Sequence, residues 1–316
     1  MKKDKLAVIG GDLRSLAAAE RLSGRFELSL YGFGGSGRQY NGTADQLCCS
    51  SSFRENDELS EYLARLPRLS ESLEAALEGC LAVILPLPAT QDGRNISTPF
   101  SDKDIPLSEL LDRMQKAGVG LLCGGRLGEN LASGCIERGI EMFDYYAREE
   151  FAIANAVPTA EGAIAIAMEE LRVTLHGSRG LVVGNGRIGR ILASKLAALG
   201  MKVTVSARKP EDFALISAAG LEAADTRTLA GLFGRESFDV IFNTVPHRVL
   251  GTAELEAIVP ETLIIDLASK PGGVDIQAAG ALGRRVIWAL SLPGKCAPVS
   301  AGRIVADTIL GYLEVN

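Results

Sequence analysis

The most informative stretch of this 316-residue chain is Arg179-Gly180-Leu181-Val182-Val183-Gly184-Asn185-Gly186-Arg187-Ile188-Gly189. Its first five residues have the composition of a buried strand, the next six have the spacing G-x-G-x-x-G, and residues 190–199 continue as a helix. In this context of strand, turn and helix, the glycines are typical of a loop that binds the pyrophosphate of a dinucleotide. The sequence therefore predicts a Rossmann-type domain in its second half.

Each glycine of this loop is required by the geometry of a dinucleotide-binding turn. Gly184 permits a tight turn, Gly186 lets the backbone approach the pyrophosphate, and Gly189 lets helix and strand pack closely. The free N–H groups and the dipole at the start of the helix favour a bound anion. The alternative is a glycine-rich turn that serves close packing alone. We expect the whole loop to bind the cofactor: Gly184, Asn185, Gly186, Arg187, Ile188 and Gly189.

The next strand, residues 202–205, indicates which dinucleotide is bound. An NAD site usually has an Asp or Glu at the end of this strand, where the carboxylate accepts a hydrogen bond from the ribose 2′-OH. Here the strand is followed by Ser206, Arg208 and Lys209, and the first acid is Glu211. These side chains can bind a 2′-phosphate, which a carboxylate would repel. We therefore predict NADP, and the alternative is a solvated basic turn.

Further strands are predicted at 238–243, 263–267 and 285–289, each followed by a polar loop with Pro or Gly. The carboxyl ends of parallel strands form the ligand crevice, so these loops should lie on the nicotinamide side. Ordinary turn chemistry is the alternative for each loop. The predicted cofactor residues here are Asn243, Thr244, Val245, Pro246, Ala268, Ser269 and Pro293.

The first half also alternates strands with helical stretches. Strand candidates lie at 6–9, 27–31, 82–85, 118–123 and 139–143. Strands separated by helices imply a parallel sheet covered on both faces. The predicted fold class is α/β, with two Rossmann-like, doubly wound parallel-sheet domains joined by a long helix. We place a substrate-binding domain at 1–150, the NADP-binding domain with the crossing helix at 151–295, and a C-terminal helix that returns to the first domain at 296–316.

Composition excludes several classes of protein. The 33 Lys and Arg against 39 Asp and Glu give a net charge of −6, which argues against a nucleic-acid-binding surface. No apolar run approaches the ~20 residues of a membrane span, and the first residues lack the apolar core of a signal peptide, so we expect a cytoplasmic protein. The six Cys form no C-x-x-C pair and the chain has two His, so we predict no metal site and mostly buried, reduced thiols. The sequence leaves open whether the chain forms a homo-oligomer.

Several short segments together resemble the family of dipicolinate synthase A subunits over essentially the whole chain. They are Ile9-Gly10-Gly11-Asp12-x-Arg14, Pro158-Thr159-Ala160-Glu161-Gly162, the glycine-rich loop, Asn243-Thr244-Val245-Pro246, Asp266-Leu267-Ala268-Ser269-Lys270-Pro271-Gly272-Gly273 and Leu292-Pro293-Gly294-Lys295. The resemblance implies an oxidoreductase that works with a flavoprotein-like B subunit in spore-forming bacteria. It implies oxidation of 2,3-dihydrodipicolinate to pyridine-2,6-dicarboxylate with NADP+, in the mother-cell cytoplasm if the organism sporulates.

That reaction needs particular residue types. A planar dicarboxylate requires hydrogen-bond donors and positive charge around it. Candidates for substrate binding are Thr43, Arg94 and Asn95 in the first domain, although Arg94 is equally consistent with an exposed loop arginine. Lys270 and Lys295 follow strands of the second domain, where each can contact the substrate or the cofactor phosphates.

The proton acceptor is expected first at Glu161, with His247 as the other candidate. Pro158 fits the first turn of a new helix, so Glu161 would lie near that helix start and face a cleft between the domains. The alternative role of Glu161 is favourable electrostatics at a helix start. His247 follows Pro246, and histidine readily exchanges a proton near neutral pH. A solvated turn residue is the alternative there.

Two other functions stay open. A shikimate-dehydrogenase-like NADP oxidoreductase would act on another small acid without a flavoprotein partner, but the lysine usual in its first domain has no obvious counterpart here. A non-catalytic NADP-binding subunit would bind the cofactor and serve as a scaffold or sensor, without turnover.

Overall fold

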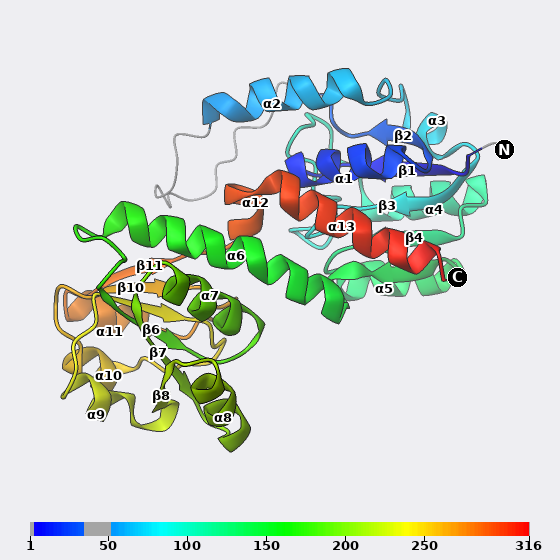
Figure 1. The fold of residues 1–316 in the computed structure, drawn as a ribbon. Coiled ribbons are helices and arrows are strands. Elements are labelled where there is room, and N and C mark those ends of the chain that lie inside the picture. Colours follow the sequence, from blue (N-terminus) through cyan, green and yellow to red (C-terminus); the bar gives the residue numbers. More distant parts are fainter. Residues whose placement is uncertain (1–2, 35–51, 316) are drawn as a thin grey trace. The chain divides into compact units, whose positions relative to one another are not determined.

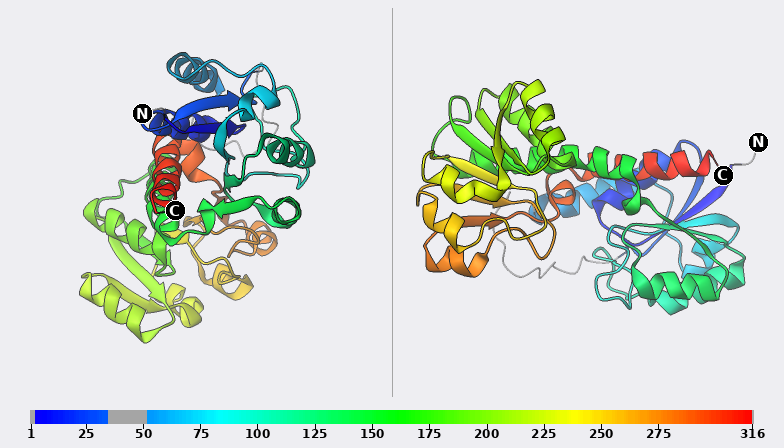
Figure 2. Two further views of the ribbon diagram at one scale, coloured as in Figure 1. Left: turned by 90° about the vertical axis from the view of Figure 1, so that its right-hand side faces the viewer. Right: turned by 90° about the horizontal axis from the view of Figure 1, so that it is seen from below.

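The computed structural model describes residues 3–34 and 52–315. The chain forms two compact units, of which the first contains Met1–Ala154 and Pro298–Asn316 and the second contains Asn155–Ala297. Helix α6 (Glu149–Glu170) carries the chain from the first unit into the second. Each unit is a parallel sheet with helices on both faces (Figures 1 and 2). The predicted fold class is therefore confirmed.

The sheet of the first unit has the strand order β2-β1-β3-β4-β5, and every pairing is parallel. The order reverses between β1 and β3, so the ligand crevice of this doubly wound sheet is expected beyond the ends of those two strands. The bounds of the strands are β1 Lys5–Ile9, β2 Glu27–Tyr31, β3 Cys80–Ile84, β4 Leu121–Gly124 and β5 Glu141–Asp144.

Alternating side chains give this sheet two cores. Along β1, Leu6 and Val8 join the core on one face, whereas Ala7 and Ile9 join the core on the other. The first face is covered by α1 (Leu13–Ser23), α2 (Ser52–Arg65) and α13 (Pro298–Leu313). The second is covered by α3 (Leu73–Leu77), α4 (Leu107–Ala117) and α5 (Gly128–Glu137). A short 3₁₀ helix, η1 (Tyr145–Ala147), follows β5.

The last helix of the chain packs on the first helix. Figure 1 shows α13 in red beside α1 in blue, and Gly302 of α13 lies against the backbone of α1 at Arg14 and Ala18. The ring of Tyr312 stacks on Phe143 of β5, with ring centroids 4.0 Å apart. The predicted return of this helix to the first domain is confirmed.

The sheet of the second unit has the order β11-β10-β9-β6-β7-β8, again with parallel pairings. This order reverses between β6 and β9. The bounds of the strands are β6 Arg179–Val183, β7 Lys202–Ala207, β8 Glu222–Asp225, β9 Val240–Asn243, β10 Leu263–Asp266 and β11 Arg285–Trp288. The helices are α7 Arg187–Ala198, α8 Pro210–Ala218, η2 Thr226–Thr228, α9 Leu229–Phe233, α10 Thr252–Ala257, α11 Ile276–Ala281 and α12 Leu292–Cys296. Helices α9, α10 and α11 cover one face, against Leu181, Ile241 and Ile264.

Local expectations failed at three places. The edge strand β8 was not predicted, because Glu222-Ala223-Ala224-Asp225 has no buried apolar run. The segment 291–298, expected to be a loop, contains the short helix α12. Helix α6 continues through Pro158. The proline lacks the N–H of one helical hydrogen bond, and the hydroxyl of Thr159 donates to the carbonyl oxygen of Asn155 at 2.8 Å.

Helix α6 is also longer and more apolar than the sequence pattern indicated. Among the described residues it alone has the length and composition to cross a membrane, with a mean hydropathy of 1.4 over an 18-residue window. The core helices of globular proteins meet the same criterion, and 56% of this window is buried inside the fold. The expectation that no segment reaches such a length overlooked this helix.

The contact between α1 and α13 depends on the missing side chain of Gly302. A Cβ there would overlap the backbone oxygen of Arg14 and lie 2.7 Å from the Cβ of Ala17. We expect Gly302→Ala to lower the free energy of unfolding by about 1–3 kcal/mol, which thermal unfolding detects.

The matched control is Gly311→Ala on the same helix, where a Cβ meets no atom of the described residues within 4 Å. This variant should be neutral or more stable by up to about 1 kcal/mol, since alanine favours the helix. Equal stability of the two variants would contradict the proposed contact.

Candidate cofactor site

The glycine-rich loop joins β6 to α7 at the point where the strand order of the second sheet reverses. Gly184 has a φ of +102°, a conformation that residues with a side chain rarely adopt. A Cβ on Gly189 would overlap the carbonyl oxygen of Gly184. The turn at Gly184 and the close approach at Gly189 are therefore both present in the folded unit.

The start of α7 is open and uncapped. Gly186 occupies the N-cap position and has no side chain that could bond the first N–H groups of the helix. A Cβ at Gly186 would meet no atom of the described residues within 4 Å. No side chain caps the N–H groups at the positive end of the helix dipole, an arrangement that suits a pyrophosphate. These residues fit a dinucleotide.

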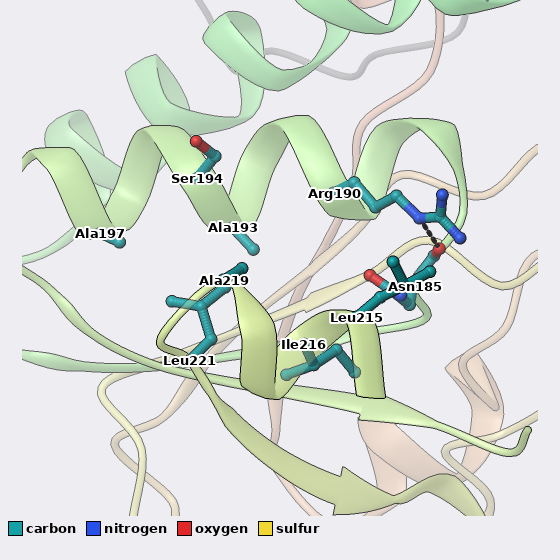
Figure 3. Close-up of a pocket in the computed structure, with 9 residues that line it drawn as sticks. All are labelled: Asn185, Arg190, Ala193, Ser194, Ala197, Leu215, Ile216, Ala219 and Leu221. Atoms are coloured by element: carbon teal, nitrogen blue, oxygen red, sulfur yellow. Dashed lines mark hydrogen bonds between the residues drawn. The ribbon is translucent and has the colours of Figure 1, made fainter. Parts of the chain in front are cut away.

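Asp212 of α8 holds the glycine-rich loop from the side. Its Oδ1 accepts hydrogen bonds from Asn185 Nδ2 at 3.1 Å and from Arg190 Nη2 at 3.2 Å. Nε of Arg190 donates to the backbone oxygen of Asn185 at 2.8 Å (Figure 3). The side-chain amide of Asn185 is thus hydrogen-bonded to Asp212. A contact of Asn185 with the cofactor, as predicted, would therefore be made by its backbone.

A cavity of about 270 Å³ lies beside these residues, between α7 and α8 (Figure 3). Apart from Asn185 and Arg190, its lining is small or apolar: Ala193, Ser194, Ala197, Leu215, Ile216, Ala219 and Leu221. This lining comes from the two helices and the turn after α8, whereas the predicted cofactor residues come mostly from the strand ends.

The end of β7 differs from the expectation at Ser206. The strand extends to Ala207, and Ser206 is fully buried, with its hydroxyl 3.0 Å from Oγ1 of Thr226. Its side chain therefore belongs to the interior of the unit and not to a surface that could receive a 2′-phosphate. Arg208 and Lys209 follow the strand and are exposed, as expected.

The acids near Arg208 at the end of β7 are paired with bases. Asp225 lies opposite Ala207 in the sheet, and its Oδ2 is 2.7 Å from Nη2 of Arg227. The hydrogen bonds from Arg227 lower the pKa of Asp225. The other nearby acid, Glu211, lies 4.0 Å from the ammonium of Lys209. Both carboxylates are thus paired, and the guanidinium of Arg208 is available at the surface.

The turn after β9 packs directly on the glycine-rich loop. The hydroxyl of Thr244 donates to the carbonyl oxygen of Val183 at 2.9 Å, and its backbone N–H donates to the same oxygen at 3.0 Å. A Cβ on Gly184 would lie 2.6 Å from the Thr244 hydroxyl and 2.8 Å from the Val245 side chain. The structure thus brings two of the predicted cofactor segments together.

The other predicted site residues of the second unit follow the strands β9, β10 and β11. Pro246 and His247 are exposed beyond β9, and Ser269 and Lys270 are exposed beyond β10, whereas Ala268 is buried. In α12, Lys295 is exposed and Pro293 is buried. The segment of Pro293 and Lys295 therefore presents a helix, not the extended strand-end loop that was expected.

Glu161 does not lie where the sequence placed it. It is in the middle of the continuous helix α6, its side chain is 57% exposed, and its carboxylate is 2.9 Å from the ammonium of Lys195 on α7. Ala160, Ala163 and Ile164 are buried, whereas Ala165 is exposed, and Glu161 lies on the exposed side of the helix. The predicted position of Glu161 in the first turn of a new helix is wrong, because the helix does not start at Pro158.

In the first unit, Arg94 and Asn95 share a turn organised by Asp92. The Asp92 carboxylate accepts from the backbone N–H groups of both residues at 2.8 Å and from the side-chain amide of Asn95 at 2.8 Å. These bonds hold the pKa of Asp92 well below its usual range, with the N–H of Asn95 contributing most. The side chain of Arg94 is exposed. Thr43 lies outside the described residues.

An ion pair beside β1 has a place in the fold that the sequence reasoning missed. Nη2 of Arg14 is 2.7 Å from Asp12 Oδ2 and donates to the carbonyl oxygen of Leu87, after β3, at 2.5 Å. The pair therefore bridges the ends of β1 and β3, where the strand order of the first sheet reverses. The sequence pattern that could have indicated this pair is a strand followed by Gly10-Gly11-Asp12-x-Arg14.

The described cysteines agree with reduced thiols. Cys80, Cys123 and Cys135 are free and buried, and Cys296 is exposed, while Cys48 and Cys49 lie outside the described residues. Burial raises the pKa of Cys123 to about 12 and that of Cys135 to about 11. Within the described ranges no group of His, Cys, Asp and Glu could hold a metal ion.

Fold and site together define a two-domain α/β protein whose second unit is built to bind a dinucleotide. Residues 5–146 match the family described as the N-terminal domain of the dipicolinate synthase A subunit. Residues 147–278 match the family described as D-isomer specific 2-hydroxyacid dehydrogenase, NAD binding domain. The second match indicates a nicotinamide cofactor and an oxidoreductase.

Similarity to characterised proteins extends over the whole chain. It is 31% identical over 310 residues to the dipicolinate synthase A subunit of Bacillus subtilis (strain 168), covering 96% of this chain and 94% of that protein. The crystal structure of the dipicolinate synthase A subunit from Bacillus halodurans superposes with a TM-score of 0.80 at 30% identity, covering 99% of this chain and 98% of that one. The crystal structure of the Bacillus subtilis protein gives the same TM-score and identity, covering 99% and 97%. The chain belongs to the family of dipicolinate synthase A subunits, as its sequence motifs predicted.

The open position at Gly186 allows a direct test of the site. With a φ of −80° and open space around it, Gly186→Ser should fold normally, and serine is a better helix N-cap than glycine. Because the serine side chain bonds the N–H groups that a pyrophosphate would use, we expect the dissociation constant of the dinucleotide to rise by about tenfold or more. Calorimetric titration and thermal unfolding measure the two effects.

Gly189→Ala is the contrasting variant, since its Cβ overlaps the loop itself. It should lower stability by about 1–3 kcal/mol before any ligand is added. Unchanged dinucleotide binding by a stable Gly186→Ser protein would rule out the start of α7 as the pyrophosphate site.

Proposed function

We propose that this protein oxidises 2,3-dihydrodipicolinate to dipicolinate with NADP+, acting in the cytoplasm together with a flavoprotein-like B subunit. The observation that carries the proposal is the 31% identity, over 96% of the chain, to the dipicolinate synthase A subunit of Bacillus subtilis. The dinucleotide-binding loop supports the redox part, because its glycines and the open start of α7 suit a pyrophosphate. In a host that sporulates, the compartment would be the mother cell.

The proposed oxidation requires the protein to orient the substrate ring and to accept a proton. Conversion of the dihydropyridine ring to a pyridine removes one hydride, which NADP+ would accept, and one proton, so atoms and charge balance with NADP+ as the oxidant. A bound nicotinamide supplies the hydride acceptor. Because the product ring is aromatic and stable, the chain has to hold the substrate ring in register and take up the proton.

We assign the proton acceptor to His247. This residue is exposed just beyond β9, on the side of the sheet where the nicotinamide half of a dinucleotide belongs. A neutral imidazole has a ring nitrogen that can accept a proton. Glu161 is the weaker candidate, because its carboxylate is paired with Lys195 on α7.

The substrate carboxylates need cationic and amide donors. Lys270, exposed beyond β10, and Arg94, exposed on the turn organised by Asp92, are the proposed partners, with Asn95 supporting that turn. Lys295 of α12, which is also exposed, is a further candidate cation for a substrate carboxylate. A guanidinium can bond a carboxylate with two parallel N–H groups, which suits recognition of a planar acid.

NADP is the proposed cofactor because of the charges at the end of β7. Arg208 and Lys209 are exposed there, and the neighbouring acids Asp225 and Glu211 are paired. A 2′-phosphate would meet cations at this edge, whereas the acid that typically binds the ribose 2′-OH of NAD is missing.

The reaction is tested with purified protein, NADP+ and dihydrodipicolinate generated from pyruvate and aspartate semialdehyde, with and without the B subunit. We expect dipicolinate and NADPH to form in equal amounts, because each ring oxidised reduces one nicotinamide. Dipicolinate is followed by its ultraviolet absorption after separation, and NADPH by fluorescence. His247→Asn should slow this reaction, whereas Glu161→Gln should leave its rate unchanged.

The enzyme-free mixture is the control. Dipicolinate formation no faster than in that control, with the partner present, would overturn the proposed reaction. NADP binding without any turnover would then indicate a scaffold subunit, and NADPH-dependent reduction of another small acid would indicate a shikimate-dehydrogenase-like enzyme.

The cofactor preference is tested by Arg208→Ala. Loss of a charge-assisted hydrogen bond to the 2′-phosphate should raise the dissociation constant of NADP+ by about tenfold or more and leave that of NAD+ within about twofold. Lys202→Ala, at the opposite end of the same strand, is the control and should change neither. Equal weakening of both dinucleotides by Arg208→Ala would exclude a 2′-phosphate contact.

A further inference from the structure

Two buried polar side chains lie next to each other at the carboxyl ends of neighbouring strands in the second unit. Asn243 ends β9 and Asp266 ends β10, and the two residues face each other in the parallel register. Their exposures are 0% and 1%. A buried carboxylate is costly unless hydrogen bonds satisfy it, so its partners indicate its task.

The Asp266 carboxylate is satisfied by N–H groups. Its Oδ1 accepts from Asn243 Nδ2 at 2.7 Å and from the backbone N–H of Ala268 at 3.0 Å. Its Oδ2 accepts from the backbone N–H groups of Gly273 at 2.8 Å and Val274 at 3.3 Å. One side chain thus ties together both ends of the loop 268–273.

Asn243 extends this connection to the turn after β9. Its side-chain oxygen accepts from the N–H of Val245 at 3.1 Å, and its Nδ2 also donates to the carbonyl oxygen of Val245 at 3.1 Å. Close approach is possible because Gly273 lacks a side chain, since a Cβ there would overlap the Asn243 amide. The two strand-end loops are therefore joined into one hydrogen-bonded unit.

These loops occupy the part of the crevice that would receive the nicotinamide. The glycine-rich loop follows β6, and the end of β7 lies on one side of it, where the adenosine ribose of a dinucleotide binds. The ends of β9 and β10 lie on the other side, so the second half of the dinucleotide extends over them. Lys270 and Ser269 form the exposed tip of the tied loop.

We propose that Asp266 is a positioning residue, which together with Asn243 holds the loops 243–246 and 268–273 in the shape that receives the nicotinamide half of the cofactor. The proposal rests on dinucleotide binding by the second unit and not on the identity of the oxidised substrate. A loop that is ordered before binding does not lose its freedom when the ligand arrives, which strengthens binding.

The test variant is Asp266→Asn, which has nearly the same volume but places an NH2 group among N–H donors. It is compared with the wild type by calorimetric titration with two probes, NADP+ and adenosine 2′,5′-bisphosphate, which lacks the nicotinamide half. We expect the dissociation constant of NADP+ to rise by about tenfold or more, and that of the fragment to stay within about twofold.

Asp275→Asn is the matched control. Asp275 is an acid two residues beyond Gly273, it caps α11 by accepting from the N–H of Ala278 at 3.1 Å, and asparagine caps helices equally well. It should change the binding of neither probe. Asn243→Asp is the second variant, because it replaces the Nδ2 donor by an oxygen beside Asp266 and should give the same selective loss if Asp266→Asn fails to fold.

Equal weakening of both probes by these variants would overturn the proposal in favour of a general structural role, and unchanged binding of NADP+ would overturn it as well. Neither titration requires dipicolinate to be formed. Failure of the proposed reaction in the wild type therefore leaves this test intact, and selective loss of NADP+ binding supports the proposal whatever the substrate is.

Discussion

The close approach of α7 to the end of β6 is the constraint on which the second unit depends. It exists because Gly189 has no side chain to collide with the carbonyl oxygen of Gly184, and because Gly184 can adopt a φ of +102°. The helix therefore starts directly above the strand, with an uncapped first turn at Gly186. Open N–H groups at the place where the strand order reverses create a site for an anion.

The strand ends around that site are organised by buried hydrogen bonds instead of by large side chains. Thr244 bonds to the carbonyl oxygen of Val183, and Asp266 and Asn243 tie the next two loops together. Asn243 and Asp266 are buried, so an unmatched partner in this pair would cost about 1–3 kcal/mol. These hydrogen bonds join the loops after β9 and β10 to each other.

The first unit uses the same principle of close approach for a different purpose. Gly302 lets α13 lie against the backbone of α1, and Val305, Ala306 and Ile309 of α13 join the core of the first unit. At the reversal point of its sheet, the Asp12–Arg14 pair bridges to Leu87. The two units thus share a doubly wound architecture but differ in what occupies the strand ends.

Sequence alone determined the features that depend on neighbours along the chain. The strand–glycine–helix order around Gly184 and the succession of parallel strands followed from local patterns, because periodicity and turn residues are visible along the chain. The basic turn at Arg208 was visible for the same reason. The edge strand β8 was not, since its residues carry no buried apolar pattern. The family and the return of the last helix followed from resemblance to known proteins.

Tertiary structure decided which way side chains point and which groups they meet. In the folded unit the side chain of Ser206 is buried against Thr226. Helix α6 continues through Pro158, and Glu161 pairs with Lys195 on another helix. The tertiary structure also joined Asn243 to Asp266, which stand 23 positions apart. Such pairings depend on the register between strands and on helix packing, and these arise from contacts between residues distant in sequence, which no local pattern encodes.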